Sequence, residues 1–309
     1  MMVHEMLFSI IIATYNAAST LPRCLRSIQE QDWQKVEVLI QDGNSTDSTG
    51  EVIRQFSDQG LPLRWWSEPD NGIYDALNRA IPQARGELIV VLGADDVLAH
   101  GALASVFETA HRKPADIYPG KALLQCPDGR QAEWKVDPCD SRAFFLSTPF
   151  CHNAMYASKT AYRTVGLYGM KYKLASDTQW IHRAIKKGLA FEPVDAVLVH
   201  FYTGGSSSDP ELVMDETYGL LQENFPALTL EDAQYLLHVA KGWAAPNRLE
   251  EVLARYSSAP LLCDAARLAA TYAPFSAQKS IDTILSQAVS PKISPFTILK
   301  HLYRKFVPC

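Results

Sequence analysis

The stretch that decides the fold is Leu88-Ile-Val-Val-Leu-Gly-Ala-Asp-Asp96, a short apolar run that ends in two adjacent carboxylates. Its apolar, partly β-branched character favours a buried strand. Adjacent carboxylates repel each other unless a cation or hydrogen-bond donors compensate. Mg²⁺ and Mn²⁺ take oxygen ligands of this kind together with substrate phosphates, which makes Asp95 and Asp96 candidate metal ligands. The alternative is that the pair caps a helix predicted near Leu103, and the pair alone does not decide between the two.

The residues around this stretch alternate regularly between strand and helix patterns. Apolar runs predict strands at residues 8–13, 36–41, 63–67 and 88–92. Helical apolar spacing follows each run, at residues 21–28, 46–56, 73–81 and 103–110. Strands that alternate with helices form mainly parallel sheets with right-handed crossovers. The predicted fold is therefore α/β, with a mainly parallel central sheet flanked by helices.

Polar clusters follow each of these four strands, and in such sheets ligands bind beyond the carboxyl ends of the strands. Asp42 follows the second strand and could accept a hydrogen bond from a nucleobase. The alternative for residues 42–47 is a tight turn with a helix cap. The four clusters are Thr14, Tyr15 and Asn16; Asp42, Gly43 and Asn44; Glu68, Asp70, Asn71 and Gly72; and Asp95 and Asp96.

The rest of the chain has a different pattern. Residues 127–129, Pro-Asp-Gly, predict a hairpin, residues 176–187 a helix, and residues 191–201 a strand. The last hundred residues look mostly helical. We expect residues 1–110 and 111–208 to be the two halves of one domain, and residues 209–309 to be a helical C-terminal extension.

The composition limits the classes of protein to which the chain can belong. The chain has 309 residues, of which 47% are hydrophobic and 20% charged, and its formal net charge is −5. These values are typical of a globular protein and predict no nucleic-acid partner. No cysteine pair has the C-x-x-C spacing of a zinc or redox site. No signal-peptide core and no run of about 18 apolar residues is present, which favours a cytoplasmic protein.

The segment 294–307 combines apolar and basic residues at helical spacing. It predicts a basic amphipathic helix that makes peripheral contact with the inner face of the plasma membrane. The alternative is a terminal helix that packs on the domain.

Four downstream residues are candidates for chemistry, each with a structural alternative. Asp177 begins a helix and is a candidate general base, or a helix cap. Trp180 could present its ring to a sugar, or lie in the core. His200 precedes the glycine loop at residues 204–205 and is a candidate metal or phosphate ligand, or a structural histidine. His152 is either structural or part of an acceptor site.

Taken together, these segments resemble glycosyltransferase family 2, which has the GT-A fold. The resemblance covers residues 7–205. The matching motifs are Ser9-Ile-Ile-Ile-Ala-Thr-Tyr-Asn16, Val38-Leu-Ile-Gln-Asp-Gly-Asn-Ser-Thr-Asp-Ser-Thr49, Leu92-Gly-Ala-Asp-Asp96, Ala175-Ser-Asp177 and His200-Phe-Tyr-Thr-Gly-Gly-Ser206. A further segment, Ser67-Glu-Pro-Asp-Asn-Gly-Ile-Tyr-Asp-Ala-Leu-Asn78, is similar to transferases that build bacterial exopolysaccharides such as colanic acid.

The resemblance implies an inverting, hexosyltransferase-like glycosyltransferase. It would move a sugar from a nucleotide-diphosphate donor to a saccharide or lipid-linked acceptor in cell-surface polysaccharide synthesis. Residues 1–110 would bind the nucleotide sugar and residues 111–208 the acceptor. The implied residues are Thr14, Tyr15, Asn16, Asp42, Asn71, Gly72, Asn78 and Asp95 for the nucleotide sugar; Asp96, Asp95 and His200 for Mn²⁺ or Mg²⁺; Asp177 as the catalytic base; and His152 and Trp180 for the acceptor.

Two departures from the family pattern qualify this prediction. Gly93 stands where many members have the first aspartate of a D-x-D motif. No Q-x-x-R-W motif follows Asp177, which favours a single-addition enzyme over a processive synthase. The alternatives are a non-catalytic nucleotide-binding module and a sugar nucleotidyltransferase. The latter usually has a glycine-rich basic loop after its first strand, but residues 14–19 contain neither glycine nor lysine.

Overall fold

The computed structural model describes residues 7–32, 35–146, 148–203 and 209–272. It divides into two compact units, Met1–Val136 with Phe150–Gly205 and Asp137–Pro149 with Ser206–Cys309. In the described ranges no helix is both long and apolar enough to span a bilayer. The expected helix at residues 294–307 lies outside the described residues.

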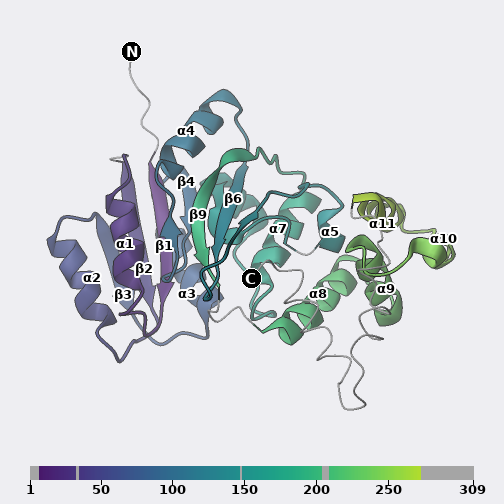
Figure 1. Ribbon diagram of the computed structural model, residues 1–309, viewed down its shortest axis with the longest axis horizontal. Helices are drawn as coiled ribbons and strands as arrows, with labels where there is room; N and C mark the ends of the chain where they lie inside the picture. The colour runs from purple at the N-terminus through teal and green to yellow at the C-terminus, as the bar shows by residue number, and fades with distance from the viewer. Residues whose placement is uncertain (1–6, 33–34, 147, 204–208, 273–309) are drawn as a thin grey trace. The chain divides into compact units, whose positions relative to one another are not determined.

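The first unit contains a mixed sheet with helices on its faces (Figure 1). Its elements are β1 (Phe8–Thr14), α1 (Leu21–Gln29), β2 (Val36–Asp42), α2 (Thr49–Asp58), β3 (Leu63–Ser67), α3 (Ile73–Ala80), η1 (Ile81–Gln83), β4 (Leu88–Val91), β5 (Val97–Leu98), α4 (Ala102–Arg112), β6 (Ile117–Gln125), β7 (Gln131–Trp134), η2 (His152–Ala154), β8 (Met155–Ser158), α6 (Lys159–Val165), α7 (Ser176–Lys186) and β9 (Val194–Tyr202).

The strand order is β3-β2-β1-β4-β8-β6-β9-β5, with β7 paired to β6. The first four strands are parallel to one another. The chain order reverses between β1 and β4, which is the switch point where open α/β sheets bind ligands. Beyond β4 the pairing is mostly antiparallel, as in β4–β8, β6–β8 and β5–β9. The predicted turn at residues 127–129 joins β6 and β7 as an antiparallel hairpin.

The core of this unit lies between the sheet and its helices. Ile10 and Ile12 of β1 are completely buried on the face covered by α1, α2 and α4. Leu21, Cys24 and Leu25 give α1 its buried face. Helix α3 contacts β1 and β2 separately from that cluster. Burying each large aliphatic side chain stabilises the fold by about 1.5–3 kcal/mol, so this packing fixes the strand ends that carry the candidate site.

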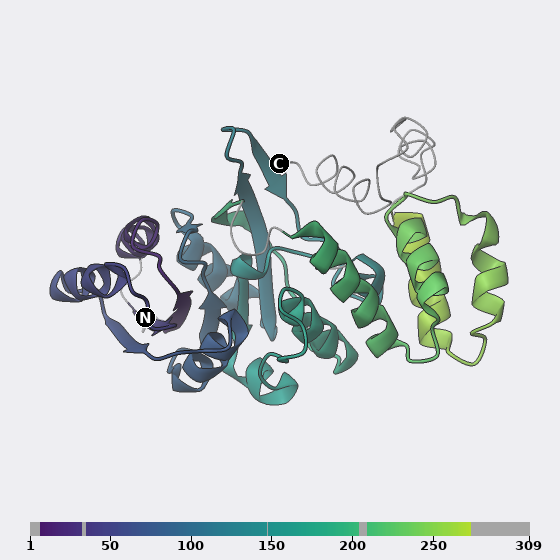
Figure 2. The same cartoon turned by 90° about the horizontal axis from the view of Figure 1, so that it is seen from below.

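The second unit is helical in its described part. It contains α5 (Ala143–Leu146), α8 (Pro210–Asn224), α9 (Leu230–Ala240), η3 (Pro246–Arg248), α10 (Leu249–Ala254) and α11 (Pro260–Tyr272). Helix α9 packs against both α8 and α11 (Figure 2). Phe225 at the end of α8 contacts the rings of Phe144 and Phe145 on α5. The predicted class, an α/β fold followed by helices, is confirmed.

One predicted boundary was wrong. Helix α2 begins at Thr49, three residues later than the sequence predicted. The backbone N–H of Thr46 donates instead to the side chain of Asn16. The Asp47 carboxylate accepts from the backbone and the hydroxyl of Thr49. Residues 43–47 therefore form a loop that is bonded to the neighbouring loop after β1.

Candidate active site

Three predicted strands end in register at one edge of the sheet. Thr14 of β1 pairs with Asp42 of β2, and Asp42 pairs with Ser67 of β3. The Asp42 side chain is 2% exposed. Its carboxylate accepts from the hydroxyls of Thr14 (2.9 Å), Ser45 (2.5 Å) and Ser67 (2.7 Å), and from the backbone N–H of Ser45 (2.9 Å). Burial raises the pKa of Asp42, but these hydrogen bonds outweigh it and the net pKa is lowered.

The loop after β1 is tied to the loop after β2. Asn16, whose φ is 49°, accepts a hydrogen bond from the Thr46 N–H, and its own N–H donates to the hydroxyl of Ser45. The ring of Tyr15 is 67% exposed, which leaves it available to a planar ligand. A side chain at Gly43 would meet the carboxylate of Asp70 at 2.7 Å, so only glycine fits there without a shift. These contacts form a preorganised polar edge.

The loop after β3 leads into α3. Gly72 has a φ of 106° and caps α3, and the backbone and side chain of Asn71 both donate to Asp75. Asn78 has a different role. Its side chain donates to the backbone oxygen of Tyr168 and accepts from the Tyr168 N–H, both at 2.9 Å. Asn78 therefore supports the segment between α6 and α7, whereas Asn71 and Gly72 remain at the exposed edge.

Asp96 is the most strongly perturbed carboxylate of the site. It is 1% exposed, and it accepts hydrogen bonds from the Tyr202 backbone N–H (2.8 Å) and from the side chain of Asn153. Burial raises the pKa of Asp96 to about 7. The neighbouring Asp95 adds to the rise, while the two hydrogen bonds and Arg23 oppose it. A nearby cation would favour the charged form of such a carboxyl.

Gly93 lies against this pair. A side chain at that position would approach the carboxylate oxygens of Asp96 at 2.4 Å and Asp95 at 3.0 Å, and the amide of Asn153 at 3.1 Å. The missing first aspartate of the family motif therefore has a steric reason here.

His200 does not join Asp95 and Asp96. Among the described residues, no three His, Cys, Asp or Glu side chains gather as a group that could hold a metal ion. His200 pairs with Val97 across β9 and β5, and its Nδ1 lies 3.2 Å from Nε2 of Gln125 on β6. The assignment of Asp95, Asp96 and His200 to a metal therefore stays a prediction.

Asp177 lies in the first turn of α7 and is half-buried. Its Oδ1 accepts from the backbone N–H of Thr178 at 2.6 Å, within the first turn, whereas the N-cap position is Ala175 and has no side-chain cap. Burial lowers the pKa of His152, and the charge of Asp177 acts in the opposite direction. The two side chains therefore lie close enough to interact. Nε2 of His152 is 2.7 Å from the hydroxyl of Tyr168.

Trp180 is not available as a platform for an acceptor sugar in this structure. Its side chain is fully buried, and its indole N–H donates to the Gly166 oxygen at 2.7 Å. The ring packs against Tyr162 and Tyr168. The structural alternative, a core tryptophan, is the one observed, because a position three residues after Asp177 on α7 faces the α6–α7 connection.

Three residues that contact Asp95 or Asp96 were not predicted as site residues from the sequence. The guanidinium of Arg23 on α1 donates to the Asp95 backbone oxygen and lies 3.5 Å from the ring centre of Tyr202. Tyr202 and Asn153 both hold Asp96. These contacts join segments that are far apart in sequence, and no local pattern identifies them.

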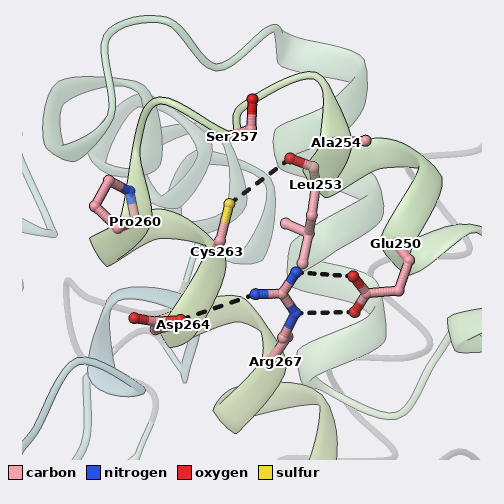
Figure 3. A pocket seen from close by; sticks show the side chains of 8 residues that line it. All are labelled: Glu250, Leu253, Ala254, Ser257, Pro260, Cys263, Asp264 and Arg267. Carbon is pink, nitrogen blue, oxygen red and sulfur yellow. Dashed lines mark hydrogen bonds and ion pairs between the residues drawn. The ribbon is translucent and has the colours of Figure 1, made fainter.

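A pocket in the second unit contains none of the predicted site residues. It lies between α10 and α11, has a volume of about 320 Å³, and is lined partly by Cys263 and Arg267 (Figure 3). Arg267 pairs with Glu250 at 2.8 Å and lies 3.8 Å from Asp264. The Cys263 thiol donates to backbone oxygens, including that of Leu253. These polar groups satisfy one another, so the pocket offers no evident chemistry.

The acidic and polar loops lie at the switch point of an α/β sheet, where open sheets of this kind bind ligands. The family comparison is specific: residues 9–160 match the model of glycosyl transferase family 2. Residues 9–160 are therefore a glycosyl transferase family 2 domain, as the sequence motifs predicted.

Two relatives illustrate the similarity. A PGL/p-HBAD biosynthesis glycosyltransferase of Mycobacterium bovis is 33% identical over 175 residues, which are 55% of this chain and 66% of that protein. The chain thus matches just under two thirds of that relative's length. A GalNAc(5)-diNAcBac-PP-undecaprenol beta-1,3-glucosyltransferase of Campylobacter jejuni is 29% identical over 119 residues, 38% of each chain.

A solved structure shares the fold. The mannosyltransferase PcManGT of Pyrobaculum calidifontis, in complex with GDP-Man and Mn²⁺, aligns with a TM-score of 0.61 and 20% identity. The alignment covers 97% of this chain and 85% of that one. The predicted GT-A fold is therefore confirmed.

Proposed function

We propose that this chain is an inverting glycosyltransferase that moves a sugar from a nucleotide-diphosphate donor to a saccharide or lipid-linked acceptor in cell-surface polysaccharide synthesis. The observation that carries the proposal is the Asp95–Asp96 pair between β4 and β5, with Asp96 buried and held by Tyr202 and Asn153. It lies in the same unit as the ordered polar loops after β1 and β2 and as Asp177.

The donor would bind at the edge formed by these loops. Tyr15 would pack near the base, and Asp42, with Thr14 and Asn16 beside it, would contact the base directly or through its hydroxyl partners. Asn71 and Gly72, in the loop after β3, would line the adjoining part of this edge. The complex of the archaeal mannosyltransferase with GDP-Man and Mn²⁺ supports a nucleotide sugar and a divalent ion for this fold.

Asp96 and Asp95 fit a divalent cation by the chemistry of their oxygens. Mg²⁺ and Mn²⁺ are commonly bound by one or two carboxylates plus substrate phosphates, so a third protein ligand is not needed. Burial raises the pKa of Asp96 to about 7 although two hydrogen bonds and Arg23 oppose the rise, so a bound cation would further favour the charged form. A bound ion would neutralise the charge that grows on the leaving diphosphate.

Asp177 would act as the general base for the acceptor. Its Oδ1 is held by Thr178, and the carboxylate would take the proton of the acceptor hydroxyl as that hydroxyl attacks the anomeric carbon. A single displacement inverts the anomeric configuration. The name of the Campylobacter relative includes an undecaprenol diphosphate, which supports a lipid-linked acceptor. His152, which interacts with Asp177, would lie on the acceptor side.

The test begins with a panel of UDP-, GDP- and dTDP-sugars, with and without Mn²⁺, assayed for transfer and for donor hydrolysis. Isothermal titration calorimetry then compares wild type with Asp96→Asn, using Asp58→Asn, an exposed aspartate at the end of α2, as the matched control. We expect Asp96→Asn to weaken Mn²⁺-dependent binding of the nucleoside diphosphate by at least about tenfold. Unchanged binding would refute the metal role, and donor binding without any turnover would favour a non-catalytic module.

A further inference from the structure

The segment that carries Asp177 is strongly cationic. Residues 159–189 contain one acidic residue, Asp177, and seven basic ones, in a chain whose net charge is −5. The basic residues are Lys159, Arg163, Lys171, Lys173, Arg183, Lys186 and Lys187. Five of them are exposed, namely Arg163, Lys171, Lys173, Lys186 and Lys187. Such a local excess of one sign attracts partners of the opposite charge.

Two large apolar side chains are exposed in the middle of this segment. Leu167 is 37% exposed and Met170 is 53% exposed, and both belong to the connection between α6 and α7 at residues 166–175. Lys171 directly follows Met170, and Lys173 is two residues further on. Apolar side chains flanked by lysines suit the boundary between lipid headgroups and acyl chains.

Leu167 and Met170 belong to a segment whose backbone is held by several hydrogen bonds. Asn78 of α3 holds both backbone polar groups of Tyr168, and Ser176 donates to the oxygens of Gly169 and Tyr172. The guanidinium of Arg183 donates to the backbone oxygen of Leu167. The fold therefore fixes the backbone from which Leu167 and Met170 project. It also brings Arg183, near the cationic end of α7, against this connection.

Two acidic side chains of α3 and of the loop before it are paired with Arg79. Helix α3, which contacts the connection through Asn78, carries Asp75 in an ion pair with Arg79 at 2.8 Å. Glu68 lies 3.6 Å from the same guanidinium. Glu68 and Asp75 are thus paired with a basic residue of α3 itself.

We propose that the 166–175 connection, together with the exposed basic residues of α6 and α7, docks on an anionic phospholipid surface. A soluble polyanion would use the lysines but would gain nothing from exposed Leu167 and Met170, so the lipid surface is the partner that matches both features. The role of this docking in sugar transfer rests on the proposed function. A lipid-linked acceptor lies at such a surface, and Asp177 follows the docking segment by two residues.

Vesicle flotation with the full chain tests the docking directly, using phosphatidylcholine vesicles with and without phosphatidylglycerol. We expect binding to the anionic vesicles only. The pair Lys171→Gln and Lys173→Gln should lower the partition coefficient by about 25-fold, since each basic residue near such a surface contributes about fivefold. The pair Leu167→Ser and Met170→Ser should lower it by at least about fivefold.

The matched controls are Leu261→Ser with Leu268→Ser, which are 49% and 48% exposed in the second unit, and Arg112→Gln with Lys113→Gln at the end of α4. Both should bind like wild type. Flotation unaffected by the connection variants would overturn the proposal. So would a loss caused by the lysine changes alone, because the proposed docking also uses Leu167 and Met170. Vesicle binding by a protein that transfers no sugar would refute the proposed function and leave the docking intact.

Discussion

At position 93, a side chain would collide with the carboxylates that it is expected to assist. Introducing the family's usual aspartate by Gly93→Asp should therefore lower, not raise, Mn²⁺-dependent donor binding, because the new Cβ would lie 2.4 Å from Asp96 Oδ2. We expect a loss of stability of about 1–3 kcal/mol from this overpacking. Calorimetry of metal binding and thermal unfolding measure both effects. Tighter metal binding at unchanged stability would show that the steric account is wrong.

Asp42 makes the free energy of unfolding depend on pH, and the hydrogen bonds to its carboxylate set the sign of that dependence. Its pKa in the folded state lies below the ordinary value of 3.8, so the folded state favours the ionised form. The stabilisation is complete above the unfolded-state pKa and is lost as the pH falls through the folded-state pKa. We expect the free energy of unfolding to fall below about pH 5, and to fall less steeply in Asp42→Asn. Denaturant titrations at several pH values would measure this, and identical acid limbs would contradict it.

The sequence predicted candidate residues of the site but not the residues that contact them. Asp42, Asp95 and Asp96 could be predicted because parallel strands bring their carboxyl ends to one edge. Arg23, Asn153 and Tyr202 could not, because they reach the aspartates from α1, η2 and β9. Trp180 was assigned chemistry from local sequence, but its side chain is buried in the core. His200 lies opposite Val97 in the β5–β9 pair, and its role as a ligand stays a prediction.

At the scale of elements, α3 and the α6–α7 connection are joined by one side chain. Asn78→Ala removes two hydrogen bonds to the Tyr168 backbone and should destabilise the fold by about 1–3 kcal/mol. Because the connection leads into α7, we also expect a lower rate of sugar transfer with little change in nucleotide affinity. Chemical denaturation and calorimetry measure these effects, and Asn247→Ala, an exposed residue of η3, is the control. Weakened nucleotide binding at unchanged stability would instead indicate direct donor contact.

Elements whose apolar residues recur with a clear period could be predicted from the sequence. Elements that depend on contacts between distant segments could not. Strands β1 to β4 and helices α1, α3 and α4 follow from apolar spacing. The sequence did not predict the late start of α2. The side chains of Asn16 and Asp47 accept hydrogen bonds from backbone N–H groups that the predicted helix would have contained. The antiparallel pairing of β8 with β4 and β6 depends on the tertiary fold, since their residues are far apart in sequence.

At the scale of the whole molecule, the proposed donor, metal and base residues all belong to the first unit. The second unit was predictable as helical, but its packing depends on particular contacts. Asp232, for example, is 2% exposed and accepts from the hydroxyl of Tyr256 and the guanidinium of Arg255. The predicted division at residue 110 within the first unit stays a prediction.

The central claim is that Asp177 is the base of an inverting sugar transfer. The most direct test is the steady-state transfer rate of Asp177→Asn with the donor found by screening, beside Asp128→Asn, an exposed aspartate in the β6–β7 turn. We predict a fall in kcat of about 10²–10⁴-fold for Asp177→Asn, with donor affinity close to that of wild type. The Asp128→Asn control should keep full activity. An Asp177→Asn protein that turns over like wild type would contradict the account.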